Sequence, residues 1–119
     1  MLKLFTRIFL ILSLSIISIT SIASHAATAS FYGGKFHGRT TASGETFNKW
    51  AMTTASNSHK MGTKLKVTNV ANGKSVIVKV NDRGGFSKYG RTLDLSRGAF
   101  AKIADIKQGL VKVKIRVVK

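Results

Sequence analysis

Two acidic residues, Glu45 and Asp82, lie inside short glycine-rich polar blocks where a carboxylate could act on a substrate. The blocks span residues 36–45 and 81–86. Acids are scarce, because the chain has 4 Asp and Glu against 20 Lys and Arg. A carboxylate kept only for solubility would more often stand among lysines, with which it forms ion pairs. Paired carboxylates on turn-forming loops are typical of general acid–base catalysis, so we predict that the two belong to one site.

Other catalytic chemistries find little support in the sequence. After residue 26 the only histidines are His37 and His59, and the chain has no Cys, so a zinc ligand set is missing. Ser43 stands in Ala-Ser-Gly, which lacks the Gly-x-Ser-x-Gly elbow of serine hydrolases. The sequence also contains no phosphate-binding loop. We therefore expect neither a metal nor a cofactor.

The first 26 residues are typical of a secretory signal peptide. Lys3 and Arg7 supply the positive start, residues 8–22 form an apolar run, and Ser24-His25-Ala26 places small side chains at the two positions, 24 and 26, where signal peptidase requires them. The alternative is an uncleaved membrane anchor, but a serine-rich run this short barely spans a bilayer. We predict a signal peptide over residues 1–26, a single domain over 27–119, and a periplasmic or secreted protein.

The positive charge stays with the predicted domain. The chain has a formal net charge of +16, and only two of its basic residues, Lys3 and Arg7, precede position 27. Such a domain attracts polyanions, which after export are wall polymers and lipid head groups rather than nucleic acid. Without Cys the domain has neither disulfides nor a lipid-modified cysteine. We expect a monomer without a stable membrane anchor, held together by backbone pairing and packing.

Alternation of apolar and polar residues predicts mainly strands. Asn72-Gly73 stands between two alternating runs and indicates a hairpin, because both residues can take positive φ. Many short strands joined by glycine-bearing loops favour an all-β domain folded as a small closed barrel, since closure removes exposed edges. The predicted strands are 64–70, 75–80 and 111–117, with shorter ones at 29–32 and 92–95.

One or two short helices complete the predicted fold. Residues 97–104 fit a helix with Ser96 as its N-cap. A second helical turn is expected around residues 45–50. The side chains of the first helix that should face inward are Phe100, Ala101 and Ile103.

Several short sequence blocks, in order along the predicted domain, resemble the conserved motifs of a known family. The periodicity of the sequence alone does not show this resemblance. The blocks are residues 29–33, 36–45, 62–63, 67–69, 72–73, 81–84 and 94–96. Together these blocks resemble the rare lipoprotein A family, and their number and spacing make the match specific. The resemblance implies a six-stranded double-psi β-barrel, related to the barrel of expansins.

The resemblance also implies an activity, that of an endolytic lytic transglycosylase. Such an enzyme cleaves the β-1,4 bond between N-acetylmuramic acid and N-acetylglucosamine in peptide-free peptidoglycan strands and leaves 1,6-anhydro ends. One carboxyl group can first protonate the leaving oxygen and then accept the proton of the attacking C6 hydroxyl. From the family motif, Asp82 is the candidate acid and base. Glu45 is the candidate second carboxylate, which positions the substrate or stabilises positive charge.

Residues near the two acids are candidates for substrate binding. We expect Tyr32 and Trp50 to be exposed, where their rings can stack on sugars. The polar side chains can bind sugar hydroxyls or orient the acids. We interpret Asp94, next to Ser96, as a structural residue that accepts backbone hydrogen bonds. The candidate substrate-binding residues are Tyr32, His37, Thr41, Ser43, Asn81, Arg83 and Trp50.

The chain departs from the family pattern near the predicted site. Relatives commonly have a histidine where this chain has Ser56, and His59 follows three residues later. The family proline after Asn-Asp-Arg-Gly is Gly85 here, which leaves the loop beside Asp82 less restricted in φ. A second hypothesis therefore stays open, a non-catalytic, expansin-like cationic barrel that binds peptidoglycan or other anionic envelope polymers.

Overall fold

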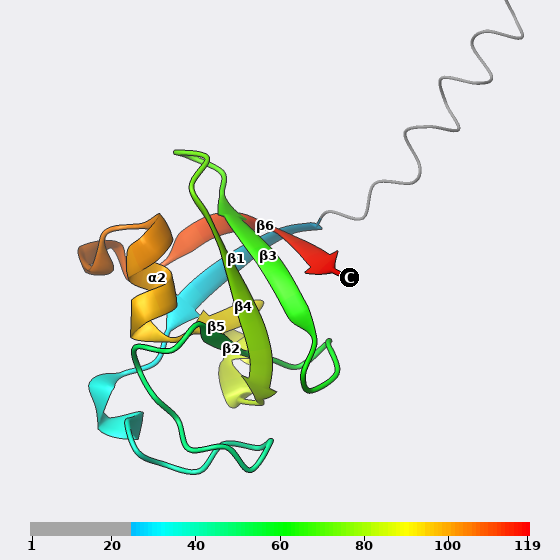
Figure 1. Cartoon of the computed structure of the whole chain (residues 1–119). Helices are drawn as coiled ribbons and strands as arrows, with labels where there is room; N and C mark the ends of the chain where they lie inside the picture. Colours follow the sequence, from blue (N-terminus) through cyan, green and yellow to red (C-terminus); the bar gives the residue numbers. More distant parts are fainter. Residues whose placement is uncertain (1–24) are drawn as a thin grey trace, which may run out of the picture.

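The computed structural model describes residues 25–119, and almost all of the predicted signal peptide lies outside this range. Six strands form a closed barrel in the order β1-β5-β2-β4-β3-β6 (Figure 1). The prediction of a mainly β, six-stranded barrel is confirmed. The strands are β1 (His25–Phe31), β2 (Thr53–Ser56), β3 (Lys64–Asn69), β4 (Ser75–Asp82), β5 (Leu93–Leu95) and β6 (Val111–Val118).

The barrel has an antiparallel side and a partly parallel side. Strands β4, β3, β6 and β1 pair antiparallel in that order. On the other side β1 runs parallel to β5, and β2 runs parallel to β4 with a register shift between Thr54 and Ala55. Strand β2 was not predicted. All of its residues are buried, so its sequence lacks the alternation that marks a half-exposed strand.

The barrel interior is the main hydrophobic core. Alternate residues of the strands point inward, as the period of two requires, and α2 (Arg97–Ile103) adds Phe100 and Ile103. The Ser96 hydroxyl accepts a hydrogen bond from the Ala99 N–H, so the predicted N-cap is confirmed. The prediction for Ala101 is wrong. This residue is exposed, because it lies on the helix face opposite to the barrel.

The hairpin between β3 and β4 is confirmed, with one difference. Gly73 has a φ of 76°, whereas Asn72 does not take positive φ. The side-chain amides of Asn69 and Asn72 instead donate to the Ile103 carbonyl at 2.7 and 3.0 Å. The hairpin is therefore joined to the C-terminal end of α2.

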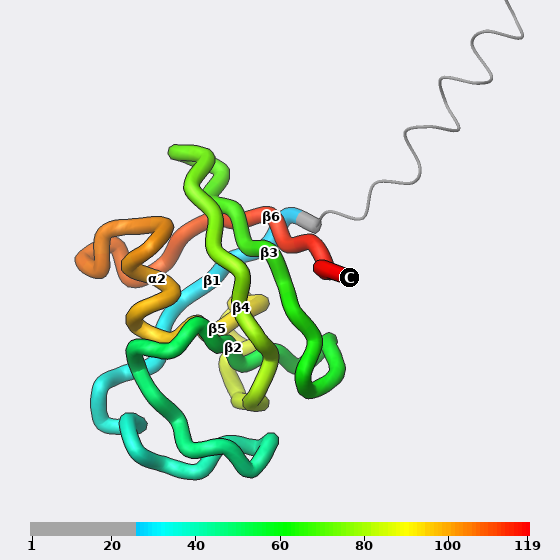
Figure 2. Tube along the Cα trace, in the orientation of Figure 1, coloured from blue at the N-terminus to red at the C-terminus, as the bar shows by residue number. Residues whose placement is uncertain are grey.

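Long connections cover the outer face of the parallel side. Figure 2 shows the segment between β1 and β2, coloured cyan to green, running around one end of the barrel. This segment and η2 (Gly85–Tyr89) enclose a second core, in which the Tyr32 ring stacks on Phe47 at 4.4 Å between centroids. The second core consists of Tyr32, Phe47, Ala55 and Phe86, with Phe36 against it.

The predicted helical turn around residues 45–50 is wrong. Residues 38–47 fold back on themselves, because the Gly38 N–H donates to the Phe47 carbonyl and the Phe47 N–H donates to the Arg39 carbonyl. The Phe47 N–H is therefore unavailable for a helix, and the hydrogen-bonded turn that does form lies later, where the Ala51 N–H donates to the Asn48 carbonyl. The remaining short elements are the 3-10 turns η1 (Gly34–Phe36) and η3 (Ile106–Gln108). In the part of the chain that the structure describes, α2 is too short to cross a membrane and no other helix is long enough to do so.

Candidate active site

One row of paired residues crosses the parallel side of the barrel and holds two carboxylates. Asp82 on β4 pairs with Ala55 on β2, Ala55 pairs with Asp94 on β5, and Asp94 pairs with Ser30 on β1. Adjacent strands lie about 4.8 Å apart, so the backbones of Asp82 and Asp94 are about 10 Å apart. Ala55 stands between them with a side chain too small to fill the space.

The two carboxylates line the same cleft, which has a volume of about 540 Å³. Ala55 is 1% exposed and lies at the base of the cleft. The walls combine aromatic and cationic side chains with the glycines that precede and begin η2. The lining residues other than the two acids and Ala55 are Phe31, Tyr32, Gly33, Phe36, Arg83, Gly84, Gly85, Phe86, Lys88, Tyr89 and Arg91.

Three donors fix the Asp82 carboxylate. Its Oδ1 accepts the backbone N–H groups of Ala42 and Arg83, each at 2.9 Å. Its Oδ2 accepts the Tyr32 hydroxyl at 2.8 Å. The loop that follows β1 and the loop that contains Ala42 therefore both dock on Asp82. With every neighbour acting as a donor, the arrangement suits a carboxylate that works through its negative charge.

Asp94 has a different environment. Burial is the largest effect on its carboxyl group and raises the pKa, and the nearby Asp82 charge also raises it. A hydrogen bond from Ser30 and the Arg91 charge lower the pKa, but the net shift is upward. The Ser30 hydroxyl donates to Oδ1 at 2.9 Å, and Arg91 in turn donates to the Ser30 hydroxyl at 3.0 Å. A raised pKa favours the protonated form, which is the form that a general acid needs.

Tyr32 lines the cleft with its hydroxyl rather than with an exposed ring. The side chain is 8% exposed, so the expected exposure of Tyr32 is wrong. Burial, followed by the hydrogen bond to Asp82, raises the pKa of its phenol above the usual range. The hydroxyl therefore stays protonated and serves as a permanent donor to the Asp82 carboxylate.

The Arg83 side chain turns away from the Asp82 carboxylate. Its guanidinium donates to the backbone carbonyl of Ser56 and, at 3.4 Å, to that of Asp82. Arg83 therefore joins the ends of the parallel strands β2 and β4. At the family histidine position, the buried Ser56 hydroxyl lies 2.9 Å from Nδ1 of His59, so the two side chains are hydrogen-bonded.

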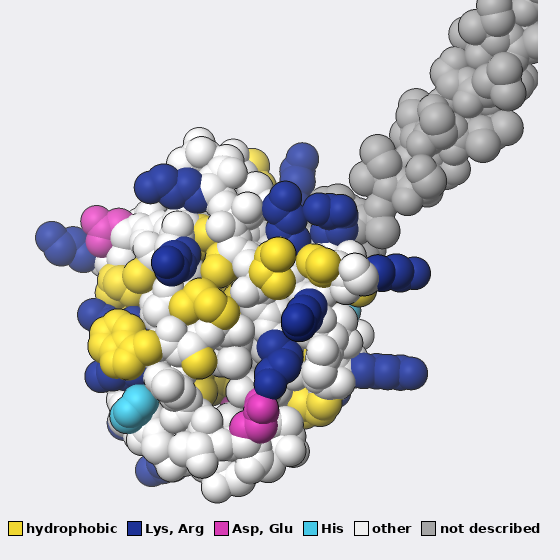
Figure 3. Space-filling view, in the orientation of Figure 1, with side chains coloured by type: hydrophobic (Ala, Val, Ile, Leu, Met, Phe, Trp, Pro, Cys, Tyr) yellow, Lys and Arg dark blue, Asp and Glu magenta, His cyan; other side chains and the backbone are white. Residues whose placement is uncertain are grey.

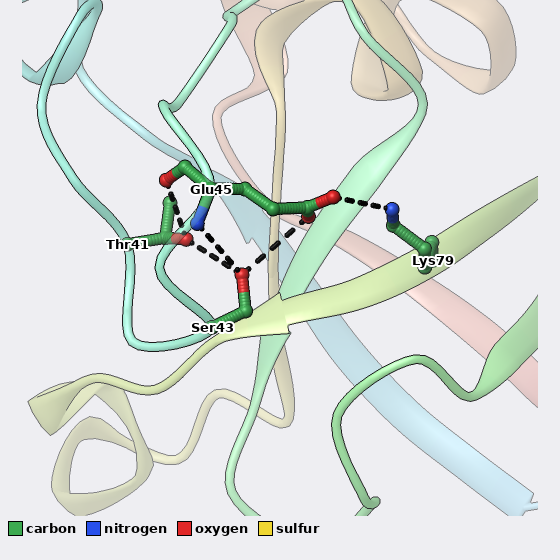
Figure 4. Close-up of polar contacts among 4 residues, drawn as sticks. All are labelled: Thr41, Ser43, Glu45 and Lys79. Atoms are coloured by element: carbon green, nitrogen blue, oxygen red, sulfur yellow. Dashed lines mark hydrogen bonds and ion pairs between the residues drawn. The ribbon is translucent and has the colours of Figure 1, made fainter.

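Glu45 lies in a separate depression and not in the cleft with Asp82. Figure 4 shows its carboxylate between Ser43 and Lys79, with the Lys79 ammonium 2.7 Å from Oε2. Hydrogen bonds from Lys79 and then Asn81, and the Lys79 charge, lower the pKa of Glu45. The two predicted acids are still linked through one loop. Its Ala42 N–H donates to the Asp82 carboxylate, and its Ser43 hydroxyl donates to the Glu45 carboxylate.

The other candidate binding residues fall outside the cleft lining. Thr41 and Ser43 bond to each other at 2.9 Å and order the loop that carries Glu45. Asn81 is buried beneath this loop, and its carbonyl accepts the Ser43 N–H. His37 accepts the Lys49 N–H through Nδ1. Trp50 is 59% exposed, as expected.

Sequence reasoning missed Asp94 as a site residue, although the signal was present. Asp94 stands between Leu93 and Leu95, which point into the barrel interior. Alternation along the predicted strand 92–95 therefore turns Asp94 outward. What the sequence could not supply is the strand order, which places β5 two strands from β4 and so brings Asp94 to the cleft of Asp82.

Replacement of Glu45 by Gln should leave stability largely unchanged. Glu45 is partly solvent-exposed, forms its ion pair with Lys79 and lies outside the cleft. We expect the urea concentration at the midpoint of unfolding to stay close to that of wild type, because an exposed ion pair contributes little. Side-by-side urea titrations of the two proteins check this. A clearly lower midpoint would show instead that the ion pair is needed to hold the loop that docks on Asp82.

Among residues 25–119, no group of three or more His, Asp or Glu side chains is placed to hold a metal ion.

Solved structures with the same fold define the class of protein. The Streptomyces papain inhibitor aligns with a TM-score of 0.65 at 21% identity and covers 82% of this chain and 96% of its own. A mutant Clavibacter michiganensis expansin in complex with cellohexaose aligns with a TM-score of 0.65 at 26% identity, covering 82% of this chain and 51% of its own. With these likenesses the predicted double-psi β-barrel is confirmed.

The family follows from sequence comparison. A family model described as lytic transglycolase matches residues 24–115, so the chain belongs to this family. It is similar to the probable endolytic peptidoglycan transglycosylase RlpA of Synechocystis, with 49% identity over 90 residues that cover 76% of this chain and 28% of that protein. The endolytic peptidoglycan transglycosylase RlpA of Pseudomonas aeruginosa is 48% identical over 88 residues, which cover 74% and 26%. The resemblance to the rare lipoprotein A family is thus confirmed, and the chain spans about a quarter of the length of these curated relatives.

Proposed function

We propose that this domain is a lytic transglycosylase that cleaves peptidoglycan glycan strands and leaves 1,6-anhydro ends. The observation that carries the proposal is the pair Asp82 and Asp94, two carboxyl groups in unlike environments within one cleft. Pairs of this kind divide the acid and charge-stabilising roles of glycosidic cleavage. Membership of the lytic transglycolase family supports the same reaction.

In the proposed reaction Asp94 supplies the proton. Its protonated carboxyl group donates to the glycosidic oxygen, and the bond from the muramic acid anomeric carbon to that oxygen breaks. The Asp82 carboxylate faces the resulting oxocarbenium-like centre and stabilises its positive charge. The C6 hydroxyl of the same muramic acid attacks the anomeric carbon, and Asp94 takes its proton. The acid is then restored and no water is consumed.

This proposal assigns the acid differently from the sequence-based prediction. That prediction gave the acid and base role to Asp82 and the supporting role to Glu45. Asp94 is better suited to donate a proton, because burial raises its pKa, whereas Asp82 is surrounded by donors. Glu45 serves in the proposal to order the loop that docks on Asp82. The substrate also implies a location outside the cytoplasm, in the periplasm or after secretion.

A second candidate function is attachment to anionic envelope polymers through the antiparallel side of the barrel. Figure 3 shows Lys and Arg side chains distributed over one face of the molecule. Lys66 pairs with Arg116, and like charges opposite one another destabilise a sheet. A polymer with repeated negative charges would offset this repulsion. The cations on the outer face, apart from Lys79 in its ion pair with Glu45, are Lys64, Lys66, Lys112, Lys114 and Arg116.

One incubation separates the two candidates. Purified protein is mixed with amidase-treated, peptide-free sacculi at several pH values from 5 to 8, and the soluble fraction is examined by mass spectrometry. Release of anhydro-muramic acid products supports the enzyme. Sedimentation of the protein with intact sacculi and no anhydro product at any pH would overturn it in favour of binding. Loss of that sedimentation at high salt would attribute the binding to the cationic face.

A further inference from the structure

Three cations line the cleft beside the two acids, and they differ in what they contact. Arg83 is held by the Ser56 and Asp82 carbonyls, which fixes it as a connection between strands. The Lys88 ammonium lies over the Tyr89 ring at 5.2 Å from its centroid. Of these three described cations, Arg91 alone donates a hydrogen bond to a side chain that itself contacts an acid of the cleft. It donates to the Ser30 hydroxyl, which in turn donates to Asp94.

Arg91 is positioned and still has free donor capacity. Its guanidinium lies 5.6 Å from the Tyr89 ring centroid and 5.9 Å from that of Phe86, which restricts its orientation. A guanidinium has five N–H donors, and the structure shows one hydrogen bond from Arg91 to another described residue, at Ser30. The remaining donors can engage a ligand in the cleft that Arg91 lines.

We propose that Arg91 is a specificity residue that binds a carboxylate of the substrate, the lactyl carboxylate of a muramic acid next to the bond that Asp94 protonates. The inference rests on the proposed function and adds a residue and a ligand group to it. A guanidinium pairs with a planar carboxylate through two parallel hydrogen bonds, which makes arginine suited to this recognition. Neutral glucans and chitin have no such carboxylate. In muramic acid that carries a stem peptide the group is an amide.

The same contact would link recognition to proton donation. The Arg91 charge lowers the pKa of Asp94 against the effect of burial. The other ionisable groups that act between these elements are Asp82 on β4 and Tyr32 after β1. A substrate carboxylate on Arg91 would neutralise its charge and so raise the pKa of Asp94. The acid would then hold its proton most firmly when an anionic sugar occupies the cleft.

The test measures binding of two small sugars, so it does not depend on catalysis. The disaccharide N-acetylglucosaminyl-N-acetylmuramic acid carries the carboxylate but lacks the cleavable bond, and chitobiose is its neutral counterpart. We expect wild-type protein to bind the anionic disaccharide about tenfold or more tightly in calorimetry, as hydrogen bonds to a charged group allow. Arg91→Gln should lose this preference, and Arg91→Lys should keep part of it. Lys102→Gln, which removes the same charge from the exposed face of α2, should keep all of it.

Each outcome bears on one claim. Equal affinity of the wild type for the two sugars, or a preference that survives in Arg91→Gln, would overturn the carboxylate site. Thermal unfolding of both Arg91 variants shows whether a lost preference reflects a damaged fold, and the folded Arg91→Lys protein keeps the test decisive. A clear preference for the anionic disaccharide, without release of anhydro product from sacculi, would contradict the proposed reaction and still support the carboxylate site.

Discussion

Asp94→Asn should reduce release of anhydro product at least about a hundredfold, because general acid–base catalysis contributes that much or more. Asn keeps the shape of the side chain and can still accept the Ser30 hydroxyl, but it has no acidic proton to donate. The measurement is the initial rate of anhydro-product formation from peptide-free strands, determined by mass spectrometry. Wild-type rates should also fall as the pH rises through the raised pKa of Asp94, since the deprotonated form cannot act as the acid.

The same variant should not lose stability at neutral pH. A carboxyl group whose pKa is raised by folding favours the fold while it is protonated, at low pH, and this contribution is lost as the pH rises through the folded-state pKa. The amide that Asp94→Asn introduces never ionises, so the variant avoids the cost of burying a charge. We expect its free energy of unfolding at pH 7 to equal or exceed that of wild type in urea titrations.

Asp105→Asn is the matched control for Asp94→Asn. Asp105 caps η3 by accepting the Lys107 N–H at 2.9 Å, and Asn is an equally good capping residue. The control should therefore keep wild-type activity and stability. If Asp94→Asn retained more than about a tenth of wild-type activity, Asp94 would not be the acid. Asp82, which the sequence predicted as the acid and base, would then be the better candidate.

The parts of the fold that could be predicted are those with a half-exposed surface. Strands β3, β4 and β6 alternate between a core residue and a more exposed one that is charged or polar at most positions, and the sequence shows this directly. Strand β2 is covered on both faces and consists of small residues, so its Thr-Thr-Ala-Ser run carries no period. The helical turn expected around residues 45–50 is wrong for a different reason, because strand-like pairing within residues 38–47, including the Thr40–Thr46 bridge, competes with helix formation.

The candidate site was predictable in part for the same physical reason. Asp82 follows a clearly alternating strand and precedes a glycine pair, so its place at the end of β4 could be read from the chain. Asp82 and Asp94 line the same cleft because β2 lies between β4 and β5, and β2 is the strand that could not be predicted from the sequence. Glu45 was grouped with Asp82 by its glycine-rich block, but only the fold shows that its side chain turns to Lys79.

Asp82→Asn should lose both activity and stability, unlike Asp94→Asn. The Asp82 carboxylate accepts three hydrogen bonds, two from backbone N–H groups and one from the Tyr32 hydroxyl. An Asn oxygen can still accept the two backbone N–H groups, and its amide nitrogen can donate to the Tyr32 hydroxyl, which can also accept, but none of these hydrogen bonds then involves a charge. We expect the free energy of unfolding to fall by about 1 kcal/mol, because hydrogen bonds to a charged group contribute more than those to a neutral one. Removal of the negative charge should also lower product release about a hundredfold or more.

Tyr32→Phe separates the two effects of Asp82→Asn. It removes one donor and leaves both the charge and the two backbone hydrogen bonds of Asp82 in place. Its rate should therefore fall much less than that of Asp82→Asn, while urea titration should show a loss of about 1 kcal/mol. If the two variants lost activity equally, the Tyr32 hydroxyl would be as important as the Asp82 charge. The cleft would then work by placing a carboxylate accurately through its donors, and not by the charge alone.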